Sequence, residues 1–452
     1  MFSKILIANR GEIAVRIIRA CKEMGISTVA VFSDADREAL HVSLADESIC
    51  IGPAPVQGSY LNKESIVMAA KLTGAEAVHP GYGLLSEDSG FALLCEENDL
   101  KFIGPSAKTI SLAGDKDEAR KSMKKAGVPT VPGSPDIVRD AEEAKELALE
   151  IGFPLLIKAR SGGGGRGIRK VNSIDEVKRA FETATAEAQS AFGDGAVYME
   201  RFMRPARHIE IQLICDDYGN VVCLGERECS IQRKNQKLVE ESPSPAVFPE
   251  LRERMMAASV LAAKAVDYRG LGTVEYLLDT ENNFYFMEMN TRLQVEHPVT
   301  ELVTDIDLVK WQIRVAAGLP LEFTQDDVKI SGHAIECRIN AENPLLNFRP
   351  SPGVITDLYL PGGNGVRIDS AVYNGYEVTP YYDSMLAKLI VHGENREEAI
   401  KKMISALGEV IVEGIDTNVD YLYSILNDSV FQSGHFDVNF IENFNKKKEN
   451  IA

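Results

Sequence analysis

The sequence predicts an α/β (α+β) protein with a parallel N-terminal sheet, a small central unit and a strand-rich remainder. Three observations lead to this fold class: apolar runs that alternate with helix-spaced apolar residues, a Pro/Gly-rich segment near residue 130, and alternating strand patterns beyond residue 204. Strands alternating with helices are typical of parallel sheets covered by helices. A length of 452 residues leaves room for two to four domains.

The chain opens with a strand–helix–strand pattern. Residues 5–8 are apolar, apolar residues then recur at helical spacing from Ile13 to Cys21, and Gly25 ends the helix before a second strand at 28–32.

Residues 77–79 and 101–103 continue the alternation, so residues 1–114 are predicted to form a parallel, Rossmann-like domain. The turn at residues 9–11 lacks the GxGxxG pattern, and we assign it no cofactor.

A linker and a smaller unit follow. Residues 115–131 read as a basic helix that ends in a Gly- and Pro-rich linker. Residues 132–203 contain an acidic helix, a strand at 154–158, a glycine loop, a second helix and a strand at 197–200. The remainder, residues 204–452, is rich in strands with alternating apolar residues.

Composition excludes several classes of protein. A net charge of −18 makes nucleic acid a poor partner, because binding it requires surplus Lys and Arg. The sequence contains neither a secretory signal pattern nor an apolar run long enough to span a membrane. Seven cysteines without a CxxC pair indicate reduced thiols and a cytoplasmic protein rather than a disulfide framework or a zinc site.

Four successive glycines at 162–165 directly follow the strand that ends at Lys158. Such a run is costly to order, and it suits close backbone approach to phosphates beside a fixed positive charge. A flexible hairpin tip is the alternative. The loop is not a Walker motif, because Gly-Lys-Ser/Thr is missing.

The segment 272–290 reads as a β-hairpin around a polar turn at 280–283. A turn centred on Glu281-Asn282 places Glu275 opposite Glu288, with Asn290 on the same face. Opposed carboxylates destabilise a sheet unless a cation neutralises them, and Mg²⁺ prefers such oxygen ligands. A solvent-separated surface pair is the alternative.

The next residues suit an anionic substrate that must lose a proton. Arg292 offers a planar donor fork and Glu296 a general base, although a solvated loop would look the same. A cationic strip at 227–237 is a further source of positive charge. Cys229 within it lacks an activating partner in the sequence and is predicted to be a small buried residue. Arg338 lies mid-strand by pattern, either paired within the fold or directed at a ligand.

Together these features closely resemble biotin carboxylase, the ATP-grasp subunit of acetyl-CoA carboxylase and related biotin-dependent carboxylases. The resemblance runs from residues 4–13 through His79-Pro-Gly-Tyr-Gly83 and residues 288–298 to Pro380-Tyr-Tyr-Asp-Ser384. It implies an ATP-grasp fold in which a mobile central lid closes over ATP, with two Mg²⁺ (or Mn²⁺) ions and with biotin supplied as a substrate on another protein.

The resemblance also implies roles for individual residues. Those for ATP are Lys116, Lys158, Gly164, Gly165, Glu200, Arg201, Phe202, Met203, His208, Gln232, Asn235, Glu275 and Glu288; those for metal are Glu275, Glu288 and Asn290. Those for bicarbonate are Lys237, Arg292, Gln294, Val295 and Glu296; those for biotin are Tyr82 and Arg338. Lys237, Arg292, Glu296 and Arg338 would be catalytic.

The implied chemistry has two stages. Glu296 deprotonates bicarbonate, which attacks the γ-phosphate of ATP to give carboxyphosphate. This breaks into carbon dioxide and phosphate, the phosphate removes the ureido proton of biotin, and Arg292 and Arg338 stabilise the enolate that attacks carbon dioxide. Every intermediate is anionic, so preorganised cations in a closed site are needed.

The sequence departs from the family at three positions. Asn235 stands where many relatives have His, Arg160 precedes the glycines where small residues are usual, and Asn364 falls where some relatives have an aromatic residue at the dimer interface. Arg19 and Glu23 match that interface, so a homodimer is predicted.

Larger members of the family carry biotin on a domain with a Met-Lys-Met signature, and no such tripeptide occurs in this chain. The resemblance therefore implies that biotin arrives on a separate biotin carboxyl carrier protein, with carboxyltransferase subunits as further partners. Acetyl-CoA, pyruvate and propionyl-CoA all stay open as the final carboxyl acceptor. Two other functions are weighed: a different ATP-grasp ligase, such as a carbamoyl-phosphate or purine-pathway enzyme, and a catalytically silent ATP-binding regulator. The segment around Glu296 together with Arg338 argues against the first, and the complete set of charged site residues argues against the second.

Overall fold

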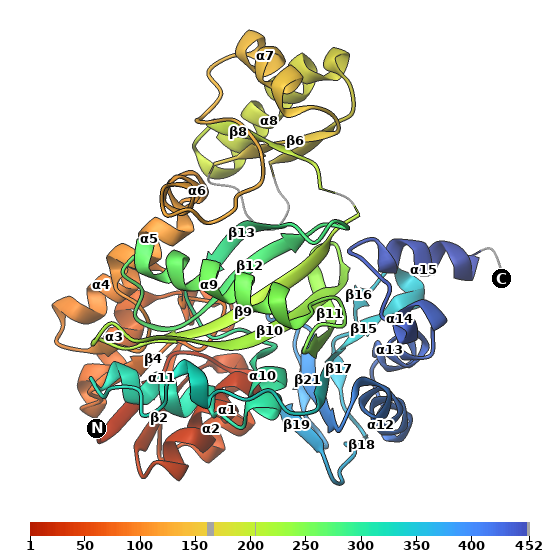
Figure 1. Cartoon of the computed structure of the whole chain (residues 1–452). Helices are drawn as coiled ribbons and strands as arrows, with labels where there is room; N and C mark the ends of the chain where they lie inside the picture. Colours follow the sequence, from red (N-terminus) through yellow and green to blue (C-terminus); the bar gives the residue numbers. More distant parts are fainter. Residues whose placement is uncertain (161–166, 204, 450–452) are drawn as a thin grey trace.

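The structure, a computed structural model, describes residues 1–160, 167–203 and 205–449 (Figure 1). A five-stranded parallel sheet forms the N-terminal part, which confirms the prediction for this region. Its order β3-β2-β1-β4-β5 places β1 at the centre, as in doubly wound sheets. The strands are β1 Lys4–Ile7, β2 Ser27–Ser33, β3 Glu47–Gly52, β4 Ala77–His79 and β5 Lys101–Phe102.

Helices cover both faces of this sheet because successive strand residues point to opposite sides. Ile5 and Ile7 pack with α1 (Gly11–Glu23), whereas Leu6 packs with residues of α3 (Lys63–Thr73) and α4 (Ser89–Glu97) on the other face. The α1 helix ends as predicted, with Gly25 in the left-handed region at φ +72°. The other helices here are α2 Leu40–Leu44 and α5 Ala107–Gly114.

A smaller unit stands apart from the main body at the top of Figure 1. Its antiparallel sheet has the order β7-β6-β8 and is covered by α7 and α8, with a separate apolar core. The helix α6 leads into it. The elements are α6 Lys116–Lys125, α7 Ala141–Ile151, β6 Leu155–Ala159, β7 Ile168–Val171, α8 Ile174–Phe192 and β8 Val197–Arg201.

The Pro/Gly-rich linker runs along the edge of the main sheet. The Phe286 N–H donates to the Pro129 carbonyl at 2.7 Å, and Thr130 forms a parallel bridge with Phe286. Arg120 of α6 donates to the carbonyls of Val131 and Ser134, at 3.1 and 2.8 Å. The linker is therefore fixed to both α6 and the main sheet.

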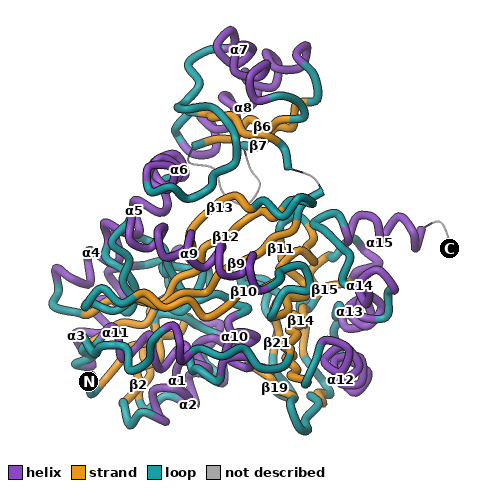
Figure 2. Tube along the Cα trace, viewed as in Figure 1, coloured by secondary structure: helices purple, strands orange, loops and turns teal. Residues whose placement is uncertain are grey.

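An antiparallel sheet of eight strands dominates the remainder (Figure 2). Its order is β13-β12-β9-β10-β11-β14-β21-β19. The strands are β9 Arg207–Cys215, β10 Val221–Arg233, β11 Gln236–Ser242, β12 Gly270–Leu278, β13 Phe284–Asn290, β14 His333–Asn340, β19 Val366–Ser370 and β21 Met385–Gly393.

Helices pack on this sheet and leave one face of β9 and β12 for polar residues. The helix α9 (Pro249–Ala265) packs on Ile209, Ile211 and Val274, and two helices, α10 His297–Thr304 and α11 Leu308–Ala316, follow β13. Alternate residues of β9 and β12 therefore face away from α9.

The C-terminal helices enclose a further core with β14 and β21. They are α12 Arg396–Glu409, α13 Val419–Leu426, α14 Ser429–Ser433 and α15 Phe440–Glu449. Short strands are β15 Glu342–Asn343, β16 Arg349–Pro350, β17 Gly353–Val354, β18 Leu358–Tyr359, β20 Glu377–Val378 and β22 Ile411–Val412; 3₁₀ turns are η1 Asp34–Asp36, η2 Val56–Gly58, η3 Gln325–Asp327 and η4 Pro344–Leu346. Among the described residues, no helix is long and apolar enough to cross a membrane.

Candidate active site

The polar face of the eight-stranded sheet gathers charged side chains from neighbouring strands. His208 and Glu210 alternate with the apolar residues of β9 that pack under α9, so they face the opposite side. Glu275 on β12 pairs directly with Glu210 in the register of the sheet. All three side chains are buried.

Lys237 on β11 lies at the centre of this group. Its Nζ contacts Glu210 and lies 2.6 Å from Glu296 and 3.5 Å from Glu275. Burial lowers the pKa of Lys237, but the three carboxylates outweigh it and raise the pKa well above its ordinary value. Lys237 is therefore a fixed cation. His208, Glu210 and Glu275 have the spacing of metal ligands, and the Nζ of Lys237 lies beside both of these carboxylates.

Glu296 is held between two cations. Besides Lys237, it accepts a hydrogen bond from Arg338 Nη2 at 2.8 Å. Burial raises the pKa of Glu296, but Lys237 and Arg338 reverse the shift and hold the pKa well below its ordinary value. Glu296 is thus ionised, as a general base must be before it takes a proton. Arg338 is fixed in turn by Glu240, with Nε to Oε1 at 2.6 Å.

The predicted register of the β12–β13 hairpin is confirmed, but its geometry contains a bulge. Glu275 pairs with Glu288, whereas Tyr276 pairs with Phe286, so Met287 is an extra residue on β13. The turn centres on Glu281 instead of between Glu281 and the next residue. Without the bulge Met287 would face Glu275, so the bulge is what brings Glu288 to this position.

The hairpin carries the oxygen donors that the sequence predicts for metal. Asn290 Nδ2 donates to Glu275 Oε1 at 2.6 Å, and His208 Nε2 lies 2.8 Å from Glu275 Oε2. Lys116 Nζ lies 3.3 Å from Glu288 Oε2. Two opposed carboxylates and an amide oxygen form a hard donor set that fits Mg²⁺, and the nearby lysine suits the phosphates that accompany this ion.

Arg292 lies beside the hairpin end and is oriented by several partners. Its Nε donates to Glu87 Oε2 at 2.9 Å, its Nη1 to Gln294 Oε1 at 2.9 Å and its Nη2 to Asn290 Oδ1 at 3.2 Å. Gln294 also donates to Glu275 at 3.2 Å. The structure therefore joins the predicted bicarbonate residues to the predicted metal residues in one network.

The predicted nucleotide residues are divided between the smaller unit and the main sheet. Lys158 on β6 donates to Glu200 on β8 at 2.5 Å, and Lys170 lies over the ring of Phe202 at 4.4 Å. Arg201 is exposed and Met203 half-buried. Gly164 and Gly165 lie outside the described residues.

Gln232 and Asn235, both predicted for ATP, lie at the end of β10 and in the turn that follows. Lys234 and Asn235 have positive φ values, +49° and +64°, between the paired residues Arg233 and Gln236. This is a two-residue hairpin turn of the type that favours Asn. The turn conformation gives a physical reason for Asn at position 235.

Tyr82, predicted for biotin, donates its hydroxyl to Glu12 of α1. Cys229 is fully buried, and burial raises its pKa well above the ordinary value, which confirms the prediction of a small buried residue. His297 is likewise buried, with Nδ1 2.8 Å from the Gln294 carbonyl. Arg160 pairs with Asp194 at 3.0 Å.

Sequence reasoning missed several charged residues that hold the site together. They are Glu12, Glu87, Glu210, Glu240 and Lys388. Arg227, from the predicted cationic strip, pairs with Glu210 at 3.0 Å. The signal for Glu210 was present, because His208, Glu210 and Gln212 alternate with apolar residues and so share one face. The others depend on contacts between distant segments.

Comparison with known proteins agrees with this geometry. Three family models match: "Biotin carboxylase, N-terminal domain" over residues 1–110, "Carbamoyl-phosphate synthase L chain, ATP binding domain" over 115–324 and "Biotin carboxylase C-terminal domain" over 336–443. Biotin carboxylase 1 of Bacillus subtilis is 57% identical over 98% of this chain and 99% of its own length. The chain belongs to the biotin carboxylase family.

Members of this family with other names are also similar. One pyruvate carboxylase subunit of Methanothermobacter thermautotrophicus is 53% identical over 99% of this chain and 91% of its own length. The biotin carboxylase domain dimer of Hydrogenobacter thermophilus 2-oxoglutarate carboxylase, solved with MgADP, ADP and bicarbonate, has a TM-score of 0.94 and 52% identity, covering 98% of each chain.

The fold is therefore the ATP-grasp fold of biotin carboxylases, as the resemblance implies, and the chain is an ATP-dependent carboxylating ligase. The ATP-binding model spans the smaller unit and the β9–β13 part of the main sheet. The site described above thus lies where the ATP-binding region meets the strand β14, which carries Arg338.

Proposed function

We propose that this chain carboxylates biotin on a separate biotin carboxyl carrier protein, through carboxyphosphate, as the first half-reaction of an acetyl-CoA carboxylase. The observation that carries the proposal is Glu296, an ionised carboxylate held between Lys237 and Arg338. A base between two cations suits an anion that must lose a proton and then react as a nucleophile.

Bicarbonate binds between Lys237, Arg292, Gln294 and the Val295 main chain. Glu296 takes its proton, and the freed oxygen attacks the γ-phosphorus of ATP, so that ADP leaves and carboxyphosphate forms. The network that orients Arg292 through Glu87 and Gln294 supports this role, because a pre-aligned guanidinium loses little entropy on binding.

The metal residues would be Glu275, Glu288 and Asn290, holding two Mg²⁺ (or Mn²⁺) ions that arrive with ATP. When bound, such ions neutralise charge on the phosphates of the nucleotide. Lys116, 3.3 Å from Glu288, contributes a further positive charge to the same phosphates. Residues 132–203 would act as the lid, with Lys158 facing the nucleotide.

Carboxyphosphate then splits into carbon dioxide and phosphate. The phosphate takes the ureido proton of biotin, and the biotin nitrogen attacks carbon dioxide to give carboxybiotin. Arg338 stabilises the enolate, with Tyr82 beside it. Arg338 is suited to this because Glu240 and Glu296 hold its guanidinium in one orientation.

The final acceptor is proposed to be acetyl-CoA, as the resemblance to the biotin carboxylase subunit of acetyl-CoA carboxylase implies. Pyruvate or propionyl-CoA is the alternative, and the Methanothermobacter relative, which is named for pyruvate carboxylase, supports pyruvate. The partner transferase decides the acceptor, so co-purification of that transferase is the observation that separates the two.

The deciding experiment measures ADP release from ATP with bicarbonate, with and without free biotin. We expect release to depend on bicarbonate and to be stimulated by biotin. ADP release that is not stimulated by biotin would contradict the proposal. Streptavidin blotting of the purified chain should find no covalent biotin; a labelled chain would show that biotin is not supplied by a separate carrier.

A further inference from the structure

Lys388 on β21 is a fully buried lysine that no predicted motif includes. It pairs with Arg338 across the β14–β21 register, so both side chains lie on the same face of the sheet. Its Nζ donates to the Val295 carbonyl at 3.0 Å. A buried ammonium is costly unless it is paired, so these contacts define its position closely.

The main chain of Val295 is held on both sides. Lys388 binds the Val295 carbonyl, and the His297 ring binds the preceding carbonyl, that of Gln294, at 2.8 Å. Burial and the nearby Lys388 hold the pKa of His297 well below its ordinary value, so the ring is neutral and Nδ1 carries the donated proton. The Gln294 carbonyl shares its peptide unit with the Val295 N–H. Both peptides that flank Val295 are therefore clamped.

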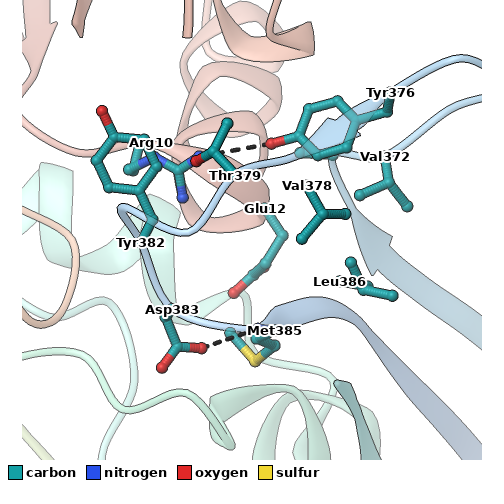
Figure 3. A pocket seen from close by; sticks show the side chains of 12 residues that line it. Arg10, Glu12, Val372, Tyr376, Val378, Thr379, Tyr382, Asp383, Met385 and Leu386 are labelled. Atoms are coloured by element: carbon teal, nitrogen blue, oxygen red, sulfur yellow. Dashed lines mark hydrogen bonds between the residues drawn. The ribbon is translucent and has the colours of Figure 1, made fainter. Parts of the chain in front are cut away.

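The same lysine reaches the predicted biotin side. Its Nζ lies 3.2 Å from Glu12 Oε1, and Glu12 accepts the Tyr82 hydroxyl. Asp369 lies 3.8 Å from Nζ. Figure 3 shows Glu12 of α1 facing the segment that carries Val378 and Leu386, across a cavity of about 30 Å³. Lys388 thus contacts the Val295 carbonyl and Glu12 directly, and Glu12 links it to Tyr82.

We propose that Lys388 is a positioning residue for bicarbonate, which fixes the Val295 main chain and ties it through Glu12 to Tyr82 on the biotin side. This inference rests on the proposed function. Without Lys388, the Val295 carbonyl loses a charged donor and the peptide is free to turn. Bicarbonate affinity then falls, while ATP, which is proposed to bind through other residues, is little affected.

The test is Lys388→Met, which keeps the length of the side chain but removes the donor. We expect the KM for bicarbonate to rise about tenfold or more while the KM for ATP changes by less than about twofold. The matched control is Lys402→Met, because Lys402 also donates to a backbone carbonyl, that of His392 at 2.6 Å, away from the site. The control should leave both KM values unchanged.

A bicarbonate KM that stays within about twofold of wild type, or that rises together with the ATP KM, overturns the inference. If Lys388→Met does not fold because the buried charge is needed, Lys388→Arg is tested instead. Arginine keeps the charge, but its planar guanidinium cannot place a donor where Nζ lies. The bicarbonate KM should then rise alone, and an unchanged value overturns the inference. Wild type without bicarbonate-dependent ADP release would instead refute the proposed function.

Discussion

Ionisation of single residues determines what this site can do. Lys237 and Arg338 keep Glu296 charged although it is buried, and Glu210 and Glu240 keep those cations in place. A buried carboxylate alone would take up a proton, so Glu296 stays ionised only because its partners outweigh the cost of burial.

The first prediction concerns Glu296→Gln, which keeps the shape of the side chain but removes the base. We expect kcat for bicarbonate-dependent ADP release to fall by about 10²–10⁴-fold, with nucleotide binding by calorimetry unchanged. The matched control is Glu241→Gln, because Glu241 is also buried and paired with an arginine, Arg396 at 2.7 Å. Substantial turnover in Glu296→Gln would mean that another group is the base.

The second prediction concerns His41, a fully buried histidine of α2. Burial lowers the pKa of His41 from 6.5 to about 4. Between these two pH values His41 is protonated in the unfolded chain and neutral in the folded chain. Stability is therefore lost as the pH falls through this window. The loss at pH 5 is about 2 kcal/mol.

Urea unfolding followed by circular dichroism at pH 7 and about pH 5 tests this. In His41→Leu the loss of unfolding free energy on acidification should be smaller by about 2 kcal/mol. His435→Leu, at an exposed histidine, is the control and should behave like wild type. An equal acid dependence in His41→Leu and wild type would show that His41 is not responsible.

At the scale of elements, the β12–β13 hairpin matters most. Its bulge at Met287 brings Glu288 opposite Glu275, and Asn290 lies at the end of the same strand. The hairpin then leads directly into Arg292 and Glu296, so one continuous segment supplies the predicted metal residues and every predicted bicarbonate residue except Lys237, which lies on β11. A short hairpin defines these positions more narrowly than a long loop would.

The third prediction tests this element through Glu288→Gln. With one carboxylate lost, we expect the Mg²⁺ concentration for half-maximal ADP release to rise about tenfold or more. Glu281→Gln, in the exposed turn of the same hairpin, is the control and should not change it. An unchanged Mg²⁺ requirement in Glu288→Gln would remove Glu288 from the metal site.

At the scale of the whole molecule, a net charge of −18 opposes the anionic substrates. The fold counters it locally by concentrating Lys116, Lys237, Arg292 and Arg338 around one face of the main sheet. Assembly is the other question at this scale. Arg19 is exposed on α1, and Glu23 on the same helix pairs with Lys310 at 2.5 Å.

The fourth prediction is that the purified chain sediments at twice its monomer mass, as the match of Arg19 and Glu23 to the family interface implies. Arg19→Glu should shift the equilibrium toward monomer, because it places a like charge near Glu23. Arg179→Glu, at an exposed arginine of α8, is the control. A wild-type monomer at micromolar concentration would contradict the predicted dimer.

Local patterns in the sequence determined much of this protein. The parallel sheet and the helix end at Gly25 follow from periodicity and turn residues, which act over a few positions of the chain. The motifs also identified the biotin carboxylase family. The predicted pairing of Glu275 with Glu288 is correct only because the bulge at Met287 offsets a turn centre that lies half a residue earlier than predicted.

Only the tertiary structure decided how the charges are partnered. Glu210, Glu240 and Lys388 lie far from Glu296 in sequence. The residues next to each of them in the sequence do not indicate which side chain it will contact. The ionisation of these three residues depends on burial and on charges that other strands bring within a few ångströms. Periodicity specifies which face a side chain takes, but the fold alone determines what it meets there.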